Sequence, residues 1–158
     1  MKARKVIIIL DNIRSNHNVG SIFRTADALG VSKIYLCGTT PKPIDRFERP
    51  VGEIAKTALG AEKSISWEYA KTTLGVIKRL KKNGTEIIAI EQFDNSVDYK
   101  KVKPKEDVAF VLGNEVDGVN KNILKLCDVV AEIPMKGGKE SLNVAVACGT
   151  ALFRILNY

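Results

Sequence analysis

The run Val6-Ile7-Ile8-Ile9-Leu10 decides the fold class that this sequence predicts. It is continuous, apolar and rich in β-branched residues, which is typical of a strand buried on both faces. Other strand-like segments alternate with helix-like segments along the rest of the chain. These predicted strands are Lys33–Cys37, Glu86–Ile90, Val108–Leu112 and Val129–Ile133. The pattern predicts an α/β fold with a parallel sheet that is flanked by helices.

The predicted helices are recognised by apolar residues at helical spacing and by residues that end a helix. The first apolar stripe consists of Val19, Ile22, Phe23, Ala26 and Leu29. Gly30 is expected to end that helix. Further helices are predicted within Val51–Leu59, Trp67–Asn83, Asn120–Cys127 and Ser141–Leu156. The proline-containing segment Thr39–Pro50 and the polar segment Gln92–Asp107 are expected to be loops.

Length and composition favour one domain, 1–158, with a polyanionic partner. Lys and Arg number 25 against 18 Asp and Glu, which gives a formal net charge of +7 and favours a nucleic acid or an anionic membrane surface. The three cysteines are widely spaced, and His17 is the only histidine, so no metal site is expected. The apolar run after the N-terminus is too short for a signal peptide or a membrane span. A cytoplasmic protein is therefore expected.

Three polar loops follow predicted strands, and this is where open α/β sheets bind ligands. The first two loops are Asn12–Asn18 and Gly113–Gly118, and the second places Glu115 at the edge of the cleft. The third loop contains two glycines and leads through Ser141 into an almost wholly apolar helix. Ser141 is expected to cap that helix, whereas Asn143 is a mediocre helix former and is interpreted as a site residue.

The first predicted helix carries an arginine that is a candidate for phosphate binding. Asn16, Gly20 and Arg24 are four residues apart, so they share one side of that helix. Gly20 removes bulk between its two neighbours, which suggests that another group approaches the backbone there. Arg24 has the planar fork that binds a phosphate, but an exposed ion pair with Asp27 is an alternative reading of the same spacing.

Two familiar nucleotide-binding motifs are absent from the predicted loops. The loop after the first strand contains no glycine, which argues against a dinucleotide-binding fingerprint. Gly138 and Lys139 are followed by Glu140 and not by serine or threonine, so this loop is not a phosphate-binding loop of the Walker type. A histidine side chain can act as a general base, but His17 has no acidic partner nearby in sequence.

Three blocks of the sequence together resemble the SpoU (TrmH-like) branch of the SPOUT methyltransferases. The first block is Asn16–Ala26, with the sequence NHNVGSIFRTA, and the second is Val111–Glu115, with the sequence VLGNE. The third is Ile133-Pro134-Met135, followed by Ser141-Leu142-Asn143-Val144-Ala145. The blocks occur in this order over nearly the whole chain.

The resemblance implies a specific fold, cofactor and product. The fold would be a parallel α/β sheet with a C-terminal deep trefoil knot, which is a rare exception to unknotted topology. S-adenosylmethionine would sit in the knot, and the enzyme would be a homodimer that methylates the 2′-hydroxyl of a ribose in tRNA or rRNA. The implied cofactor contacts are Ile90, Leu112, Gly113, Ile133, Met135 and Leu142.

The resemblance also assigns roles to the polar residues. Arg24 corresponds to the catalytic arginine, and its supporting polar set is Asn16, Glu115, Ser141 and Asn143. A guanidinium with a pKa above about 12 rarely gives up its proton, so we expect Arg24 to clamp a phosphate and stabilise the developing alkoxide. Ser141 and Asn143 are expected to orient the hydroxyl and the arginine. Glu115 is expected to position Arg24 or Asn16.

Relatives often carry an added N-terminal RNA-binding domain or helical extensions, and no separate RNA-binding domain is expected here. Selection of the RNA would then depend on the methyltransferase domain itself or on a partner protein. The alternative function is a catalytically idle RNA-binding module with the same fold. Such a module need not keep Arg24, Glu115, Ser141 and Asn143 together, and all four are present.

Overall fold

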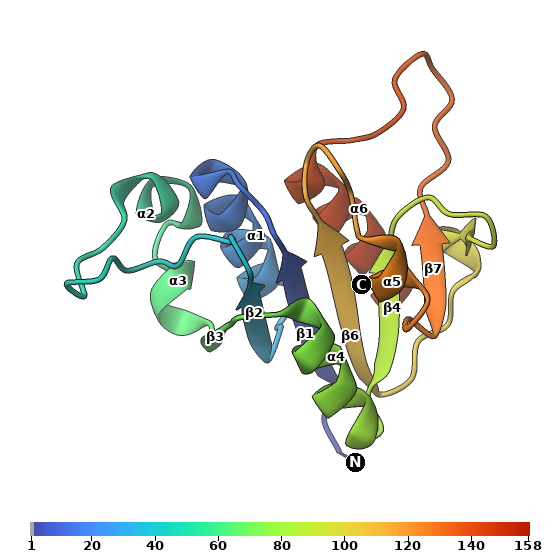
Figure 1. Ribbon diagram of the computed structural model, residues 1–158, viewed down its shortest axis with the longest axis horizontal. Coiled ribbons are helices and arrows are strands. Elements are labelled where there is room, and N and C mark those ends of the chain that lie inside the picture. Colours follow the sequence, from blue (N-terminus) through green and yellow to red (C-terminus); the bar gives the residue numbers. More distant parts are fainter. Residues whose placement is uncertain (1) are drawn as a thin grey trace.

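A computed structural model describes residues 2–158 and contains one fully parallel sheet (Figure 1). The strand order is β3-β2-β1-β6-β4-β7-β5. The strands are β1 (Lys5–Asp11), β2 (Lys33–Cys37), β3 (Trp67–Ala70), β4 (Glu86–Ile90), β5 (Val97–Asp98), β6 (Asp107–Gly113) and β7 (Val129–Glu132). The prediction of a parallel α/β sheet is confirmed, and β1 and β6 form its centre.

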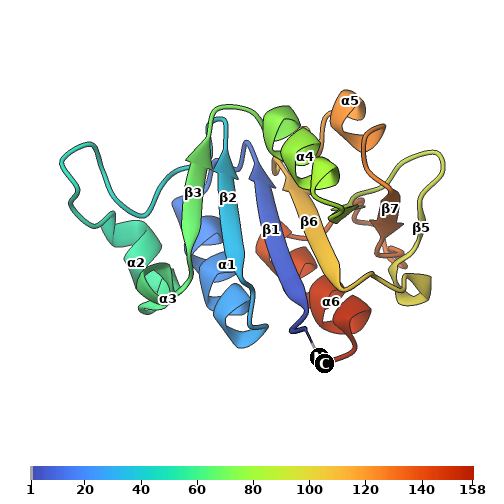
Figure 2. The same ribbon diagram turned by 90° about the horizontal axis from the view of Figure 1, so that it is seen from below.

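Helices cover both faces of this sheet. They are α1 (Asn16–Ala28), α2 (Gly52–Ala58), α3 (Ala61–Ser64), α4 (Thr73–Lys82), α5 (Lys121–Leu124) and α6 (Val144–Leu156), with a 3-10 turn η1 (Tyr99–Lys101). Alternate residues of β1 point to opposite faces, so Ile8 joins a core with α1 and α6, whereas Ile9 joins a core with α4 and α5. Figure 2 shows β1, β2 and β3 pointing in the same direction, so the loops that follow them leave from one edge.

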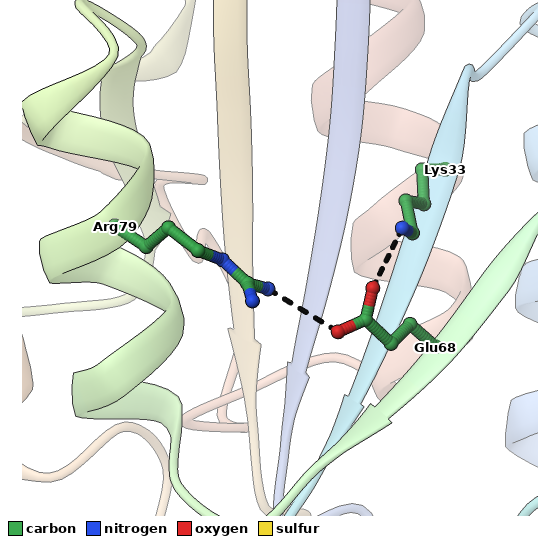
Figure 3. A network of polar contacts seen from close by, with 3 residues as sticks. All are labelled: Lys33, Glu68 and Arg79. Atoms are coloured by element: carbon green, nitrogen blue, oxygen red, sulfur yellow. Dashed lines mark hydrogen bonds and ion pairs between the residues drawn. The ribbon is translucent and has the colours of Figure 1, made fainter.

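Two edge strands depart from the sequence prediction. β3 lies inside the segment that was expected to contain only a helix, and β5 lies inside a segment that was expected to be loop. Neither strand has a continuous apolar run, because an edge strand needs burial on fewer sides. In β3, Glu68 accepts hydrogen bonds from Lys33 of β2 at 2.7 Å and from Arg79 of α4 at 3.4 Å (Figure 3). This network ties the edge strand to its neighbour strand and to a helix.

The start of the last helix also differs from the prediction. Ser141 is not the cap of α6, because the helix begins at Val144 and Asn143 occupies the N-cap position. The Asn143 side-chain oxygen accepts hydrogen bonds from the backbone N–H of Ala145 at 2.9 Å and of Val146 at 3.2 Å. Ser141 therefore remains in the loop before the helix. Asn120, by contrast, caps α5 as expected, although α5 ends at Leu124.

Gly20 allows α1 and α2 to pack closely. A Cβ atom built on Gly20 would lie 1.9 Å from the Thr57 hydroxyl oxygen and 2.4 Å from the Ile54 carbonyl oxygen. The expected close approach to the backbone at Gly20 is confirmed, and the group that approaches is α2. The contact fixes the rotation of α1 about its own axis. This rotation determines which polar side chains of α1 point toward α2 and which point toward α6.

We expect Gly20→Ala to lower the free energy of unfolding by about 1–3 kcal/mol, because a backbone carbonyl of α2 leaves no room for a methyl group. Gly149→Ala in α6 is the matched control, since its Cβ would meet only a Thr25 methyl group at 3.8 Å. In a helix interior that change stabilises by up to about 1 kcal/mol. Urea unfolding of the two variants tests the pair, and equal effects would contradict the packing described here.

Candidate active site

A cavity of about 1140 Å³ lies at the carboxyl edge of the sheet. Its walls come from the loops that follow β1, β2, β4, β6 and β7 and from the beginning of α6. This is the edge at which open parallel sheets bind ligands. The lining combines apolar side chains, backbone groups of three loops and several carboxyl groups, so it suits a ligand with both apolar and charged parts.

The structure places most of the candidate residues along this cavity. All six residues proposed for the cofactor line it: Ile90, Leu112, Gly113, Ile133, Met135 and Leu142. Three of the five proposed catalytic residues also line it, namely Glu115, Ser141 and Asn143. The other two, Asn16 and Arg24, lie elsewhere on the molecule.

A hydrogen-bond network joins three loops at the rim of the cavity. The Glu115 carboxylate accepts hydrogen bonds from the backbone N–H of Arg14 at 3.1 Å and of Ser15 at 3.2 Å. It also accepts one from the Asn18 side-chain amide at 3.2 Å. Asn143 in turn donates to the Asn18 side-chain oxygen at 3.0 Å. Glu115, Asn18 and Asn143 thus connect the loops after β1 and β6 to the first turn of α6.

Asn18 is the site residue that the sequence analysis missed. It is two residues beyond Asn16, which points it toward α6, whereas Asn16 points toward α2. The available signal was Ser15, which caps α1 by accepting a hydrogen bond from the Asn18 backbone N–H and so fixes where the helix begins. Within its own chain Glu115 forms no hydrogen bond with Arg24 or Asn16, and its side-chain contacts are with Asn18 and with the loop after β1.

The Glu115 carboxyl has a lowered pKa. Partial burial alone would raise this pKa, but hydrogen bonds from its own backbone N–H, from those of Arg14 and Ser15 and from the Asn18 amide outweigh burial. These donors stabilise the ionised form and thereby hold the pKa below its usual value. Glu115 therefore serves as an anionic acceptor that organises the loops, which is unlike the raised pKa of a general acid.

Asn16 and Arg24 face away from the cavity. The Asn16 side-chain amide donates to Glu53 of α2 at 2.9 Å. Arg24 is exposed and borders a separate depression beside the turn between α2 and α3. The alternative ion pair with Asp27 does not form within residues 2–158, and Asp27 instead accepts a hydrogen bond from Ser64 at 3.1 Å.

The loop after β6 is folded tightly against the end of its own strand. A Cβ atom on Gly113 would lie 2.4 Å from the Val119 backbone nitrogen and 2.5 Å from the Gly118 carbonyl carbon. Glu91 accepts a hydrogen bond from the same Val119 N–H at 3.1 Å. The Asn114 side chain holds the other end of the loop, because it donates to the Asn12 carbonyl oxygen at 2.8 Å. These contacts give the cavity a wall of ordered backbone.

Asp11 is a buried carboxyl group in the cavity wall. It is 5% exposed, and burial raises its pKa, although a hydrogen bond from the Thr73 hydroxyl opposes the rise.

Within residues 2–158, no group of three His, Cys, Asp or Glu side chains is arranged to hold a metal ion. None of the helices in that range is long and apolar enough to cross a membrane.

The structure is that of an α/β protein with a cavity at the carboxyl edge of a parallel sheet. The sequence model of the SpoU rRNA Methylase family matches residues 5–153, and the chain belongs to this family. A putative TrmH family tRNA/rRNA methyltransferase of Staphylococcus saprophyticus is 32% identical over 149 residues. The 23S rRNA (guanosine-2′-O-)-methyltransferase RlmB of Neisseria meningitidis is 33% identical over 147 residues.

These alignments cover 94% and 93% of this chain but only 57% and 56% of the two relatives. The chain thus spans about half the length of the curated relatives it matches. An AdoMet-bound rRNA methyltransferase from Sinorhizobium meliloti superposes with a TM-score of 0.86 and 30% identity, over 99% of this chain and 57% of that one. The TrmH/SpoU tRNA modifying enzyme of A. aeolicus superposes with a TM-score of 0.84 and 28% identity, over 99% of this chain and 76% of that one.

We expect the rim network to weaken as the pH falls through the pKa of folded Glu115. Because the pKa of Glu115 in the folded state lies below the ordinary glutamate value of 4.5, the stability that Glu115 contributes is present above about pH 4.5 and is lost below it. Glu115→Gln removes the charge at all pH values. The difference in free energy of unfolding between wild type and this variant should therefore shrink below pH 4.5, and a difference that grows on acidification would contradict this assignment.

Proposed function

We propose that this chain is an S-adenosylmethionine-dependent methyltransferase that acts on the ribose 2′-hydroxyl of a nucleotide in tRNA or rRNA. The observation that carries the proposal is the Glu115–Asn18–Asn143 network at the rim of the cavity. It fixes polar groups from three distant parts of the chain at the mouth of a ligand site. Relatives named as tRNA or rRNA methyltransferases over nearly all of this chain support the same reaction.

The cavity fits S-adenosylmethionine in size and in chemistry. Ligand pockets commonly measure about 300–1,000 Å³, so a cavity of about 1140 Å³ accommodates a cofactor together with one reacting nucleotide. Acidic side chains outnumber basic ones in the lining, and they complement the positive sulfonium: Asp11, Glu91, Glu115, Asp117 and Glu140 against Arg14 and Lys121. When bound, the cofactor supplies an electrophilic methyl group. Ile90, Leu112, Gly113, Ile133, Met135 and Leu142 would hold it.

Calorimetry should detect binding of S-adenosylmethionine and of its demethylated product without added metal and in the presence of a chelator. Gly113→Ala should abolish this binding, because a methyl group at that position displaces the backbone of the loop at Gly118 and Val119. Gly137→Ala in the loop after β7 is the control, since a Cβ there meets no atom within 4 Å. Binding of NAD or ATP in place of S-adenosylmethionine would overturn the cofactor assignment.

We infer that the protein works as a homodimer in which Arg24 of one copy serves the cavity of the other. Arg24 does not reach the cavity of its own chain, so a second copy is the simplest source of this side chain. The helix α6 supports the assembly, because Val146 and Phe153 are 53% and 38% exposed and lie seven residues apart on one side. Together with the exposed Leu142 they form an apolar stripe beside the cavity that a second copy would bury.

The residues at the rim would orient and activate a ribose hydroxyl. Methyl transfer requires the attacking oxygen in line with the methyl group, so the hydroxyl has to be held in one position. Ser141 lines the cavity, and Asn143 keeps one amide hydrogen beyond the one given to Asn18. The Arg24 guanidinium stays charged, clamps the neighbouring phosphate and stabilises the developing alkoxide.

A mixing experiment tests the shared site. Arg24→Ala and Gly113→Ala should each lower the methylation rate about 10²-fold or more, the first by removing a charge clamp and the second by displacing the loop backbone that would hold the cofactor. When the two variants are mixed and form dimers at random, about half of the dimers contain one chain of each variant. If the site is shared, one of the two sites in each mixed dimer is intact, so about a quarter of wild-type activity returns. No recovery would show that Arg24 acts within its own chain. Wild-type rates for Arg24→Ala would remove it from the site.

We also propose the C-terminal deep trefoil knot. The strand order supports this proposal, because β6 and β7 follow each other along the chain but lie on opposite sides of β4 in the sheet. The connection from β6 to β7 therefore passes over β4. After β7 the chain returns across the sheet, and α6 packs against β4, β6 and η1. The loops after β4, β6 and β7, which such a knot would bring together, also line the cavity, so the knot would shape the cofactor site.

A further inference from the structure

The loop between β2 and α2 carries an exposed aromatic side chain flanked by two arginines. Phe47 is 60% exposed, which is unusual for a phenylalanine. The guanidinium carbons of Arg46 and Arg49 lie 4.7 Å and 4.9 Å from the centre of its ring. We refer to residues 45–49 as the loop tip. It projects away from the sheet, beyond α2 (Figures 1 and 2).

The loop tip is held in one conformation by Asp45. The Asp45 carboxylate accepts hydrogen bonds from the backbone N–H of Phe47 at 2.8 Å, from that of Arg49 at 3.0 Å and from the Arg49 side chain at 2.9 Å. An antiparallel bridge between Ile44 and Pro50 closes the loop below the tip. A rigid loop loses little conformational entropy when it binds a partner, so this construction favours recognition.

The base of the loop is anchored at the cavity. Thr39 lines the cavity, and the Thr40 hydroxyl is buried, where it donates to a carbonyl and accepts a hydrogen bond from the Ile13 N–H at 3.0 Å. A second pair of cation and aromatic ring follows along the loop, because the Lys42 ammonium lies 5.2 Å from the centre of the half-exposed Tyr69 ring. Along the loop, a second pair of cation and aromatic ring therefore lies between the cavity-lining Thr39 and the loop tip.

Packing within the chain does not account for the loop tip. Phe47 belongs to neither of the two hydrophobic cores. Asp45 accepts a hydrogen bond from the Phe47 backbone N–H and does not hold the ring. Within residues 2–158, Arg46 forms no ion pair with a carboxylate. An exposed ring beside a guanidinium without a carboxylate partner points to a ligand that is both aromatic and anionic.

We propose that the loop tip binds single-stranded RNA, with an unpaired base stacked on Phe47 or on the neighbouring guanidinium planes and with Arg46 on a phosphate. RNA-binding proteins recognise unpaired bases through aromatic rings and arginine planes. The net charge of +7 by itself would also suit an acidic protein surface. A nucleotide supplies a π face for the Phe47 ring and a phosphate for Arg46, and this combination favours RNA. The inference rests on the proposed function, and it names where the substrate is held outside the cavity.

The test uses the whole chain and a fluorescent 20-nucleotide single-stranded RNA, with binding measured by anisotropy at several salt concentrations. Phe47→Leu keeps an apolar side chain but loses the π face, so affinity should fall about tenfold. Phe47→Trp should retain wild-type affinity. Arg46→Ala should weaken binding and should lower the slope of log affinity against log salt by about 0.7, which corresponds to one phosphate contact.

Lys78→Ala is the matched control, because this exposed lysine lies on α4 at the opposite face of the sheet and forms no ion pair within residues 2–158. It should change neither affinity nor slope. Equal losses for Lys78→Ala and Arg46→Ala would reduce the effect to overall charge and overturn the proposal. Wild-type affinity for Phe47→Leu would also overturn it, and would favour a protein partner that needs only an apolar contact.

The same measurements separate this proposal from the proposed function. If the tip variants lose RNA affinity while the wild type transfers no methyl group to any RNA, the tip remains an RNA site and the methyltransferase assignment fails. If the wild type methylates RNA and the tip variants bind and react normally, the methyltransferase assignment stands and the tip proposal fails. A wild type that binds no RNA would overturn both.

Discussion

The carboxylate of Glu115 is the group on which the arrangement of the site depends. It binds two backbone N–H groups after β1 and the amide of Asn18, which in turn holds Asn143 at the start of α6. These contacts form only because β1 and β6 are neighbours in parallel register, with Asp11 beside Gly113 at the carboxyl edge. A shift of one strand by one residue would turn side chains to the other face and separate the loops.

The central part of the fold could be predicted from the sequence because its residues are buried on both faces. β1 and β6 are continuous apolar runs, and no solvated segment gives such a run. β3 could not be predicted in this way, since it lies at the edge and carries Glu68 as part of an ion-pair network with a helix. β5 has two residues, which is too short for any periodicity to appear.

The position of the cavity could be predicted, but the side chains that form the network at its rim could not. Loops after parallel strands meet at one edge, so the candidate cofactor residues and Glu115 fell along one cavity. The distinction between Asn16 and Asn18 depends on the rotation of α1, which Gly20 sets through its contact with α2, a helix more than thirty residues away in sequence. Similarly, the choice of Asn143 over Ser141 as helix cap depends on where the loop after β7 ends.

The cofactor and the RNA of the proposed reaction carry opposite charges. The protein places its acidic groups around the cavity and most of its basic groups outside it. Carboxyl groups predominate around the cavity, where they suit a cationic cofactor but would repel an RNA backbone. The excess of basic residues therefore lies outside the cavity, and Arg24 and the loop tip belong to this outer set. An RNA held by such outer groups can present one ribose to the acidic cavity while its phosphates remain on cationic surface. Under the proposed function, this separation accounts for an Arg24 side chain that lies outside the cavity of its own chain.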